Sequence, residues 1–257
     1  MLIKLADYIG AKSISCAERL GEIGLFLGDS VVTLFTTRLK LKKLFYYMNY
    51  IGVNSLGVVG LIGITGGAVL ALQSYIGLHR FGAQRFIGPV VFLSMTRELG
   101  PVFTAIMVIG RAGSAITAEI GTMRITEQID ALQTLCINVK QYLVIPRILA
   151  GTFILPFLSI ICSLSGILSG YLIAVYALGI NSEVYMEAIR ESSELSDITI
   201  GLLKSCFFGF LITLVSTYKG YTTSGGSKGV GIATTESVVF SNVTIFIANY
   251  ILTSLLF

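Results

Sequence analysis

The sequence predicts an all-α integral membrane protein, and three observations support this fold class. Hydrophobic residues make up 54% of the 257 residues and charged residues only 12%, whereas soluble domains carry roughly 25% charged residues. The mean hydropathy is +0.84. Long apolar runs recur between short polar segments. We therefore expect two regions, an N-terminal interfacial helix with a basic linker (residues 1–45) and a transmembrane domain of five helices (residues 46–257).

The first 35 residues are amphipathic and too polar to span a bilayer. Their charged residues leave no window of about 20 apolar residues; these are Lys4, Asp7, Lys12, Glu18, Arg19, Glu22 and Asp29. We expect a helix lying along the membrane interface, with a soluble cytoplasmic arm as the alternative. The basic cluster from Arg38 to Lys43 directly precedes the first apolar run and places the N-terminal side in the cytoplasm.

Five apolar runs are long enough to form spanning helices. We expect the spans near residues 51–78, 89–118, 144–178, 200–217 and 237–257. With the N-terminus inside, the connector 122–140 and the loop 218–236 lie in the cytoplasm. The acidic segment 179–198 and the C-terminus then lie outside, which agrees with the position of the basic cluster.

Small and polar residues within the spans indicate where helices meet. Gly63 and Gly67 form a GxxxG spacing, and Gly166 and Gly170 form a second small-xxx-small pair. Such pairs allow two helices to approach closely, here within one subunit or across a homodimer. Gln73, near the far end of the first span, needs a polar partner or a cavity.

The second span carries the strongest chemical signal in the chain. Arg97 and Glu98 lie side by side in an apolar run, where an ionisable group costs roughly 2.5–3.5 kcal/mol on insertion scales. Such residues face a bundle interior or a wet cavity. Pro101 follows closely and should kink the helix, because it lacks an N–H and its ring crowds the carbonyl of Arg97. We expect a polar substrate site at this point.

A charged helix outside the membrane follows this span. Thr126 is the predicted N-cap of a short helix over residues 126–132, with Glu127 and Gln128 in a first turn where acidic groups suit the helix dipole. A polar defect inside the membrane is thus joined directly to a polar cytoplasmic helix. This arrangement is typical of a transporter that senses something outside the bilayer.

Several functions are disfavoured. No basic face for nucleic acid is present, and a single histidine with four scattered cysteines excludes a structural zinc site. The run from Gly220 has Gly226 where a P-loop requires lysine. No hydrolytic motif is found, so we expect neither an enzyme nor a cofactor. The energy for transport must come from a partner or an ion gradient.

The chain resembles the MlaE family of permeases. The residues that carry the resemblance are RELGPVFTAIMVIGRAGSAITAEIGTMRITEQIDAL from Arg97, IPR from Ile145, GLLKS from Gly201, and GVGIATTESVV from Gly229 with the C-terminal NYILTSLLF. The resemblance implies a homodimeric permease of the inner membrane that moves phospholipid to or from the outer membrane. It also implies two cytoplasmic ATPase subunits, a periplasmic MCE-domain protein and often a small STAS-type partner. The N-terminus would be cytoplasmic and the C-terminus periplasmic.

The resemblance also assigns residues. Arg97 and Glu98 match a pair that faces the lipid cavity, and Lys204 matches a family lysine near the outer end of its span; with Gln73 they form the expected lipid-binding set. The segment from Thr126 to Leu132 matches the coupling helix that docks on the ATPase. The expected coupling residues are Glu119, Arg124, Thr126, Glu127, Gln128 and Asp130. Asn249 stands where the family often has aspartate, which puts a charge-dependent role there in doubt.

Two other classes of protein remain as alternatives. A secondary transporter would bind its substrate and a coupling ion at the Arg97/Glu98 helix break, but an odd number of spans without self-similarity disfavours it. A structural subunit would use its polar residues only to lock helices together. For Arg97 and Glu98 themselves, the alternative to a phosphate site is an internal ion pair that stabilises the bundle.

Overall fold

The computed structural model describes residues 21–30, 32–33 and 41–256, and every regular element in that part is helical. Five of its helical segments are long and apolar enough to cross a membrane. A short N-terminal helix is formed by residues 21–30 and 32–33. The predicted fold class is therefore confirmed. Residues 1–20, 31, 34 and 35 of the predicted interfacial helix lie outside the described residues, and its placement in the membrane interface stays a prediction.

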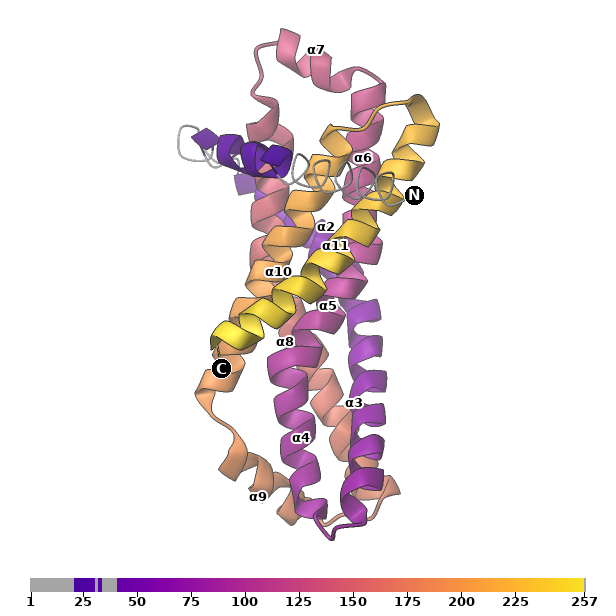
Figure 1. Cartoon of the computed structure of the whole chain (residues 1–257), viewed down its shortest axis with the longest axis vertical. Helices are drawn as coiled ribbons and strands as arrows, with labels where there is room; N and C mark the ends of the chain where they lie inside the picture. Colours follow the sequence, from indigo (N-terminus) through magenta and orange to yellow (C-terminus); the bar gives the residue numbers. More distant parts are fainter. Residues whose placement is uncertain (1–20, 31, 34–40, 257) are drawn as a thin grey trace, which may run out of the picture.

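The spanning segments are built from several helices each, including π-helical turns (Figure 1). In chain order the elements are α2 (Leu41–Gly52), the 3-10 turn η1 (Val53–Ser55), α3 (Leu56–His79), the 3-10 turn η2 (Gln84–Phe86), α4 (Ile87–Ser94), the π-turn η3 (Met95–Leu99), α5 (Gly100–Val108), the π-turn η4 (Ile109–Gly113), α6 (Ser114–Ile125), α7 (Gln128–Thr134), the π-turn η5 (Lys140–Val144), α8 (Ile145–Leu172), the π-turn η6 (Ile173–Ala177), α9 (Ser182–Ser192), α10 (Leu195–Tyr221) and α11 (Gly226–Leu256). The first span thus begins about ten residues earlier than the sequence predicted.

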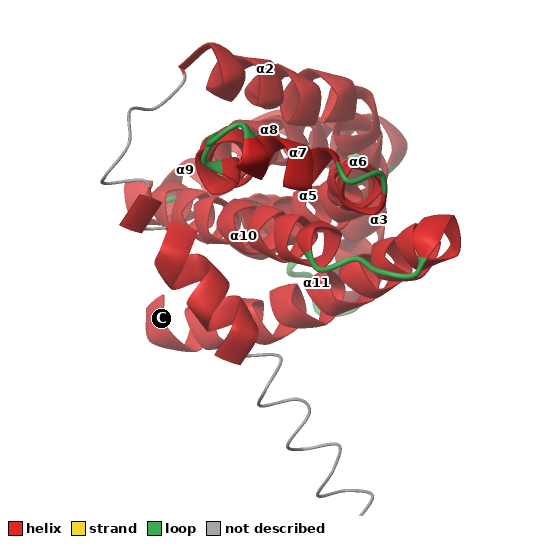
Figure 2. Cartoon of the chain, turned by 90° about the horizontal axis from the view of Figure 1, so that it is seen from above, coloured by secondary structure: helices red, strands yellow, loops and turns green. Residues whose placement is uncertain are grey.

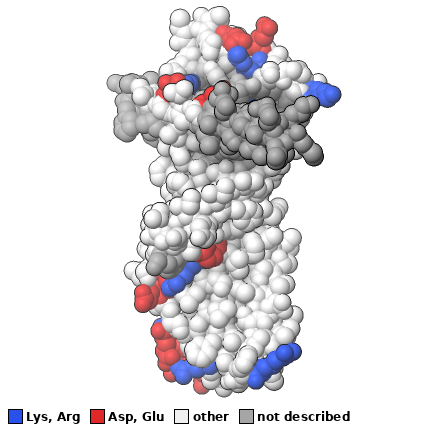
Figure 3. All heavy atoms as spheres, viewed as in Figure 1, with Lys and Arg blue, Asp and Glu red and all other residues white. Residues whose placement is uncertain are grey.

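Helix α8 is the centre of the bundle. It packs against α3 on one side and α10 on another, and α2 and α5 complete its surroundings. Figure 2 shows α11 on the outside, where it crosses α10 and α6. Helix α7 and the turn before α11 lie at one end of the molecule, and α9 lies at the other (Figure 1). On the face seen in Figure 3, charged side chains gather towards these two ends and leave an uncharged band between them.

The close packing of α3 on α8 depends on the predicted glycine pairs. A Cβ atom on Gly67 would collide with the carbonyl oxygen of Gly166, and one on Gly63 would collide with that of Cys162. Ser169 adds a hydrogen bond of 2.7 Å from its hydroxyl to the carbonyl of Ile64. The two small-xxx-small pairs therefore pack helices within one subunit, which was one of the two expected arrangements.

Replacing Gly67 by valine should lower the free energy of unfolding by about 1–3 kcal/mol, because a backbone carbonyl cannot move aside as a side chain can. Gly60 on the same helix has no atom within 4 Å of an added Cβ. Gly60→Val is therefore the matched control and should change stability by less than about 0.5 kcal/mol. Denaturation in mixed micelles measures both variants. Equal losses would show that helix propensity, and not the α3–α8 contact, decides the effect.

The loop predicted between the last two spans is corrected by the structure. The predicted loop 218–236 is wrong over most of its length, because α10 continues to Tyr221 and α11 begins at Gly226. The hydroxyls in this glycine- and threonine-rich stretch bond to carbonyls of their own helix, as at Thr234 (2.7 Å to Val230). Lys219 and Glu236 also form an ion pair of 2.6 Å that ties the two helices together.

The helix break at Pro101 takes the form of a π-turn. Residues Met95–Leu99 are π-helical, the N–H of Gly100 bonds to the carbonyl of Met95, and Pro101 lies in the first turn of α5. A proline in a first turn does not need the N–H that it lacks, and the preceding π-turn accommodates the displaced hydrogen bonds. The break is therefore a wide turn that carries both Arg97 and Glu98.

Candidate functional site

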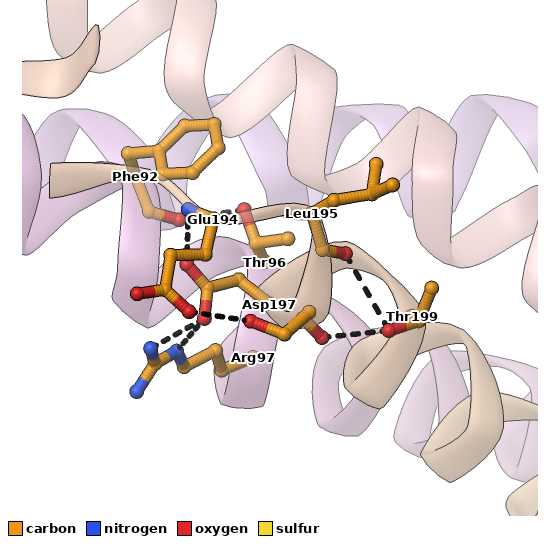
Figure 4. A network of polar contacts seen from close by, with 8 residues as sticks. Phe92, Thr96, Arg97, Glu194, Leu195, Asp197 and Thr199 are labelled. Atoms are coloured by element: carbon orange, nitrogen blue, oxygen red, sulfur yellow. Dashed lines mark hydrogen bonds and ion pairs between the residues drawn. The ribbon is translucent and has the colours of Figure 1, made fainter. Parts of the chain in front are cut away.

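The candidate site is a set of four paired charges between the second span and α10. Arg97 donates from Nε to Oδ1 of Asp197 at 2.7 Å, and its Nη2 contacts the same oxygen (Figure 4). Glu98 forms its ion pair with Nζ of Lys204. The Asp197 and Lys204 side chains are 0% exposed, whereas Arg97 and Glu98 are each 31% exposed. Arg97 and Glu98 therefore do not pair with each other; each is held by a buried partner.

Helix geometry explains the arrangement. Arg97 and Glu98 are consecutive residues of the π-turn Met95–Leu99, and consecutive helical residues point in different directions, so each side chain meets a different partner. Asp197 and Lys204 are seven residues apart, which places them two turns apart on one face of α10. The positive Arg97 meets the negative Asp197, and the negative Glu98 meets the positive Lys204, so the four formal charges sum to zero. Charges inside a membrane domain are commonly paired with one another in this way.

Asp197 also forms hydrogen bonds that cap the beginning of α10. Its Oδ2 accepts the backbone N–H of Glu194 at 3.0 Å, and the Glu194 side chain accepts in return from the N–H of Asp197, which forms a capping box. Figure 4 shows Glu194 beside the carboxylate that faces Arg97. A carboxylate at this position also benefits from the helix dipole. Arg97 is thus oriented by a group that is itself fixed by the backbone.

The last helix closes the site from another side. The hydroxyl of Thr253 on α11 lies 3.0 Å from Oε1 of Glu98 and accepts from Lys204 Nζ at 2.8 Å. One turn earlier, the side-chain oxygen of Asn249 is buried and has no hydrogen-bond partner among the described residues. Three spans therefore meet at Glu98. Gln73 is different: it is exposed on α3 and is not part of this set of contacts.

Sequence reasoning missed Asp197, which it left within an acidic segment interpreted as solvated. Two signals could have found it. Asp197 and Lys204 have the spacing of one helix face at the start of an apolar run. Their signs also complement those of Arg97 and Glu98, an adjacent pair of opposite charges inside a predicted span.

Glu119 belongs to a second internal ion pair, away from α7. Its Oε1 lies 2.7 Å from Nη2 of Arg147, which is 0% exposed and stacks over the Tyr47 ring with 4.3 Å from Cζ to the centroid. Arg147 also donates from Nη1 to the carbonyl of Leu143 at 2.7 Å. Arg111 on the π-turn η4 donates to the Ser55 hydroxyl at 2.7 Å. Arg111 also donates from Nη2 to the carbonyls of Tyr50 and Ile51 in α2. The charged residues of the second span therefore join it to α10, to α2 and to α8.

The predicted cap of the polar helix is wrong. Thr126 is the C-cap of α6, and its hydroxyl donates to the carbonyl of Thr122 at 2.8 Å. Glu127 is the N-cap of α7, with a left-handed φ of 59° and no side-chain cap bond. The cause is that α6 continues four residues beyond Gly121, so the chain must reverse sharply before α7. Arg124 and Asp130 close this turn with an ion pair of 2.6 Å. Gln128 is the first residue of α7.

Five long apolar helices with paired charges between them define a multi-pass membrane protein. The sequence profile "Permease MlaE" matches residues 44–255, and the chain belongs to this family. A "Probable ABC transporter permease protein" of Rickettsia felis is 44% identical over 257 residues, which is 100% of this chain and 99% of that protein.

Two further relatives extend the comparison. The "Intermembrane phospholipid transport system permease protein MlaE" of Haemophilus influenzae is 35% identical over 258 residues, which is 100% of this chain and 99% of the relative. "Protein TRIGALACTOSYLDIACYLGLYCEROL 1, chloroplastic" of Arabidopsis thaliana is 37% identical over 235 residues, which covers 91% of this chain and 67% of the relative.

Proposed function

We propose that this chain is the membrane permease of an ABC transporter that moves phospholipid between the inner and outer membranes. The match to the MlaE permease family over residues 44–255 is the observation that carries the proposal. The full-length similarity to an intermembrane phospholipid transport permease supports it. ATP hydrolysis belongs to a separate cytoplasmic subunit. Family membership also sets aside the alternative of a secondary transporter driven by an ion gradient.

Within this function, Arg97 and Glu98 are the proposed lipid-contacting residues. Each keeps 31% of its side chain exposed while a buried partner fixes it. A guanidinium offers a planar set of donors that matches phosphate oxygens, a geometry that lysine cannot reproduce. Lys204 is 0% exposed and would act on the lipid through Glu98. Gln73, exposed on the first span, stays a predicted lipid contact.

The proposed partners follow from the same function. The end of the molecule that carries α7 would face the cytoplasm and contact an ATPase dimer, with the N-terminus on that side and the C-terminus periplasmic. A second copy of the chain, a periplasmic MCE-domain protein and a small STAS-type protein would complete the assembly in the inner membrane. Helices α7 and α9 lie at opposite ends of the molecule (Figure 1), and the basic cluster from Arg38 to Lys43 in the sequence supports a cytoplasmic N-terminal side.

Copurification tests the proposal. The chain is isolated from membranes in mild detergent, and the bound proteins and lipids are identified by mass spectrometry. We expect an ABC-type ATPase and phospholipid in stoichiometric amounts. Transport that needs an ion gradient, with no ATPase bound, would contradict the proposal.

Charge reversal at Glu127 tests the proposed contact of α7 with the ATPase. Glu127 is exposed, next to the turn between α6 and α7. Glu127→Lys should reduce lipid-stimulated ATP hydrolysis about tenfold, since losing one charge-assisted contact costs roughly 1.5–3 kcal/mol. The permease should still insert. The matched control is Glu183→Lys on α9, an exposed glutamate at the opposite end of the molecule, which should leave hydrolysis unchanged. Undiminished stimulation in the Glu127 variant would refute the contact.

A further inference from the structure

The N-terminal helix packs against the bundle near the end that carries α7 (Figure 1). Ile23, Phe26 and Leu27 lie on its packed face, at the spacing of one helix side. The residues that they meet come from two different spans and comprise Val144, Ile148, Phe210, Leu214, Tyr218 and Tyr221. The helix therefore bridges the beginning of the third span and the end of α10.

Phe26 is the centre of this contact and is only 7% exposed. Its ring lies 5.7 Å from the ring centroid of Tyr218, in an edge-on arrangement, and 5.7 Å from that of Tyr221. The Nζ atom of Lys140 lies 5.5 Å from the Phe26 ring centroid. Aromatic pairs and cation–π contacts of this geometry contribute beyond simple apolar burial.

Two polar contacts flank Phe26 on the same helix. Glu22 accepts a hydrogen bond of 2.5 Å from the Tyr218 hydroxyl. Asp29 forms an ion pair of 2.6 Å with Lys140. Glu22 and Asp29 are seven residues apart, or two helical turns, so one side of the helix contacts both the end of α10 and the residue that begins η5.

These contacts also reach the attachment points of α7. Lys140 begins the π-turn directly after the connection from α7. Tyr221 accepts a hydrogen bond of 3.5 Å from Gln133 on α7. An open hollow of about 370 Å³ separates the connection from α10, lined by residues 136–140 with Gln133 and Tyr221. One side of α7 is anchored by Ile129, which is 0% exposed in the main core. On the side of the hollow, the contacts that hold α7 and its connection are those of Tyr221 and Lys140.

We infer that the N-terminal helix positions α7, with Phe26 as the central positioning residue. It holds Tyr221 and Lys140 in place, and these two residues fix the far side of the α7 connection. This role rests on the proposed function, in which α7 contacts the ATPase. When the ATPase displaces α7, the N-terminal helix then resists this movement. The movement is therefore transmitted to α8 and α10, because the connection after α7 is held and cannot simply bend.

Hydrogen exchange of the amides in residues 128–137 tests this role in the full chain, in lipid nanodiscs without ATPase. Phe26→Ala should accelerate their exchange about tenfold, while amides in the middle of α8 keep their protection. The control is Leu25→Ala on the same helix, since Leu25 is 74% exposed. Unchanged exchange in Phe26→Ala would overturn the inference. Equal acceleration in both variants would assign the effect to membrane anchoring and would also overturn it, as would loss of protection throughout α8.

Coupling provides the second measurement. With the ATPase bound, Phe26→Ala should lower lipid-stimulated hydrolysis about fivefold at unchanged ATPase occupancy, and Leu25→Ala should not. Accelerated hydrogen exchange with unchanged lipid-stimulated hydrolysis would support the positioning of α7 by Phe26. The same result would refute the proposed contact of α7 with the ATPase. The two measurements therefore test the two proposals separately.

Discussion

Replacing Lys204 by methionine is expected to lower the free energy of unfolding by about 3–5 kcal/mol, the range observed when one partner of a buried ion pair is removed. The side chain is 0% exposed and contacts Glu98 and Thr253. Methionine fills a similar volume, so packing changes little. The loss arises because Glu98, of which 31% is exposed, keeps its charge while no other cation is in contact with it among the described residues.

Lys219 on the same helix provides the matched control. It pairs with Glu236, whose side chain is 48% exposed, and exposed pairs contribute about 0.2–1 kcal/mol. Denaturation in mixed micelles should therefore separate Lys204→Met from Lys219→Met clearly. The double variant Glu98→Gln/Lys204→Met removes both charges and should recover at least half of the loss. Equal stability of Lys204→Met and the parent chain would show that water reaches Glu98 and satisfies it.

The sequence was sufficient for those features that depend on residues near one another in the chain. The spans follow from continuous apolar runs, and Gly63, Gly67 and Gly166 have the correct spacing for a close helix contact. The ion-pair partners of Arg97 and Glu98 could not be predicted from nearby residues. Arg97 and Glu98 were recognised as anomalous, but their partners lie about 100 residues later, and the fold alone brings the two segments together.

The incorrect local predictions have physical causes of the same kind. The segment from Gly226 to Glu236 has the composition of a loop, yet it is helical because it continues a spanning helix and its hydroxyls bond to their own backbone. Thr126 has the residue type of an N-cap but ends a helix, since α6 extends beyond the apolar run. In both cases the neighbouring helix decides the conformation and overrides the local preference.

The distortions of the second span coincide with its charges. Arg97 and Glu98 lie on the π-turn Met95–Leu99, and Arg111 lies on the π-turn Ile109–Gly113. Single π-turns inside α-helices occur frequently at functional sites, where they redirect side chains. Here they turn adjacent charges towards different partners. The second span is therefore held at several points along its length. Arg97 and Glu98, each 31% exposed, are the charged pair proposed to contact the lipid.

Arg97→Lys is expected to reduce bound phospholipid about tenfold, since the charge-assisted bonds of a planar guanidinium to phosphate contribute roughly 1.5–3 kcal/mol. Lysine keeps the positive charge opposite the buried Asp197, so stability should change little. Asp197→Asn should instead have its main effect on stability. It leaves Arg97 present but removes its fixed partner and part of the capping box, and it should lower the free energy of unfolding by about 3–5 kcal/mol.

The two variants separate a lipid site from a structural ion pair. Lipid occupancy is measured by mass spectrometry of the purified chain, and stability by denaturation of the same samples. Arg147→Lys is the control for the arginine-to-lysine change, since Arg147 also forms an ion pair but is 0% exposed and pairs with Glu119. The lipid occupancy of this variant should stay at the parental level. If Arg97→Lys retains its phospholipid, and Arg97→Ala only lowers stability to the extent that Asp197→Asn does, then Arg97 stabilises the bundle and does not hold the lipid phosphate.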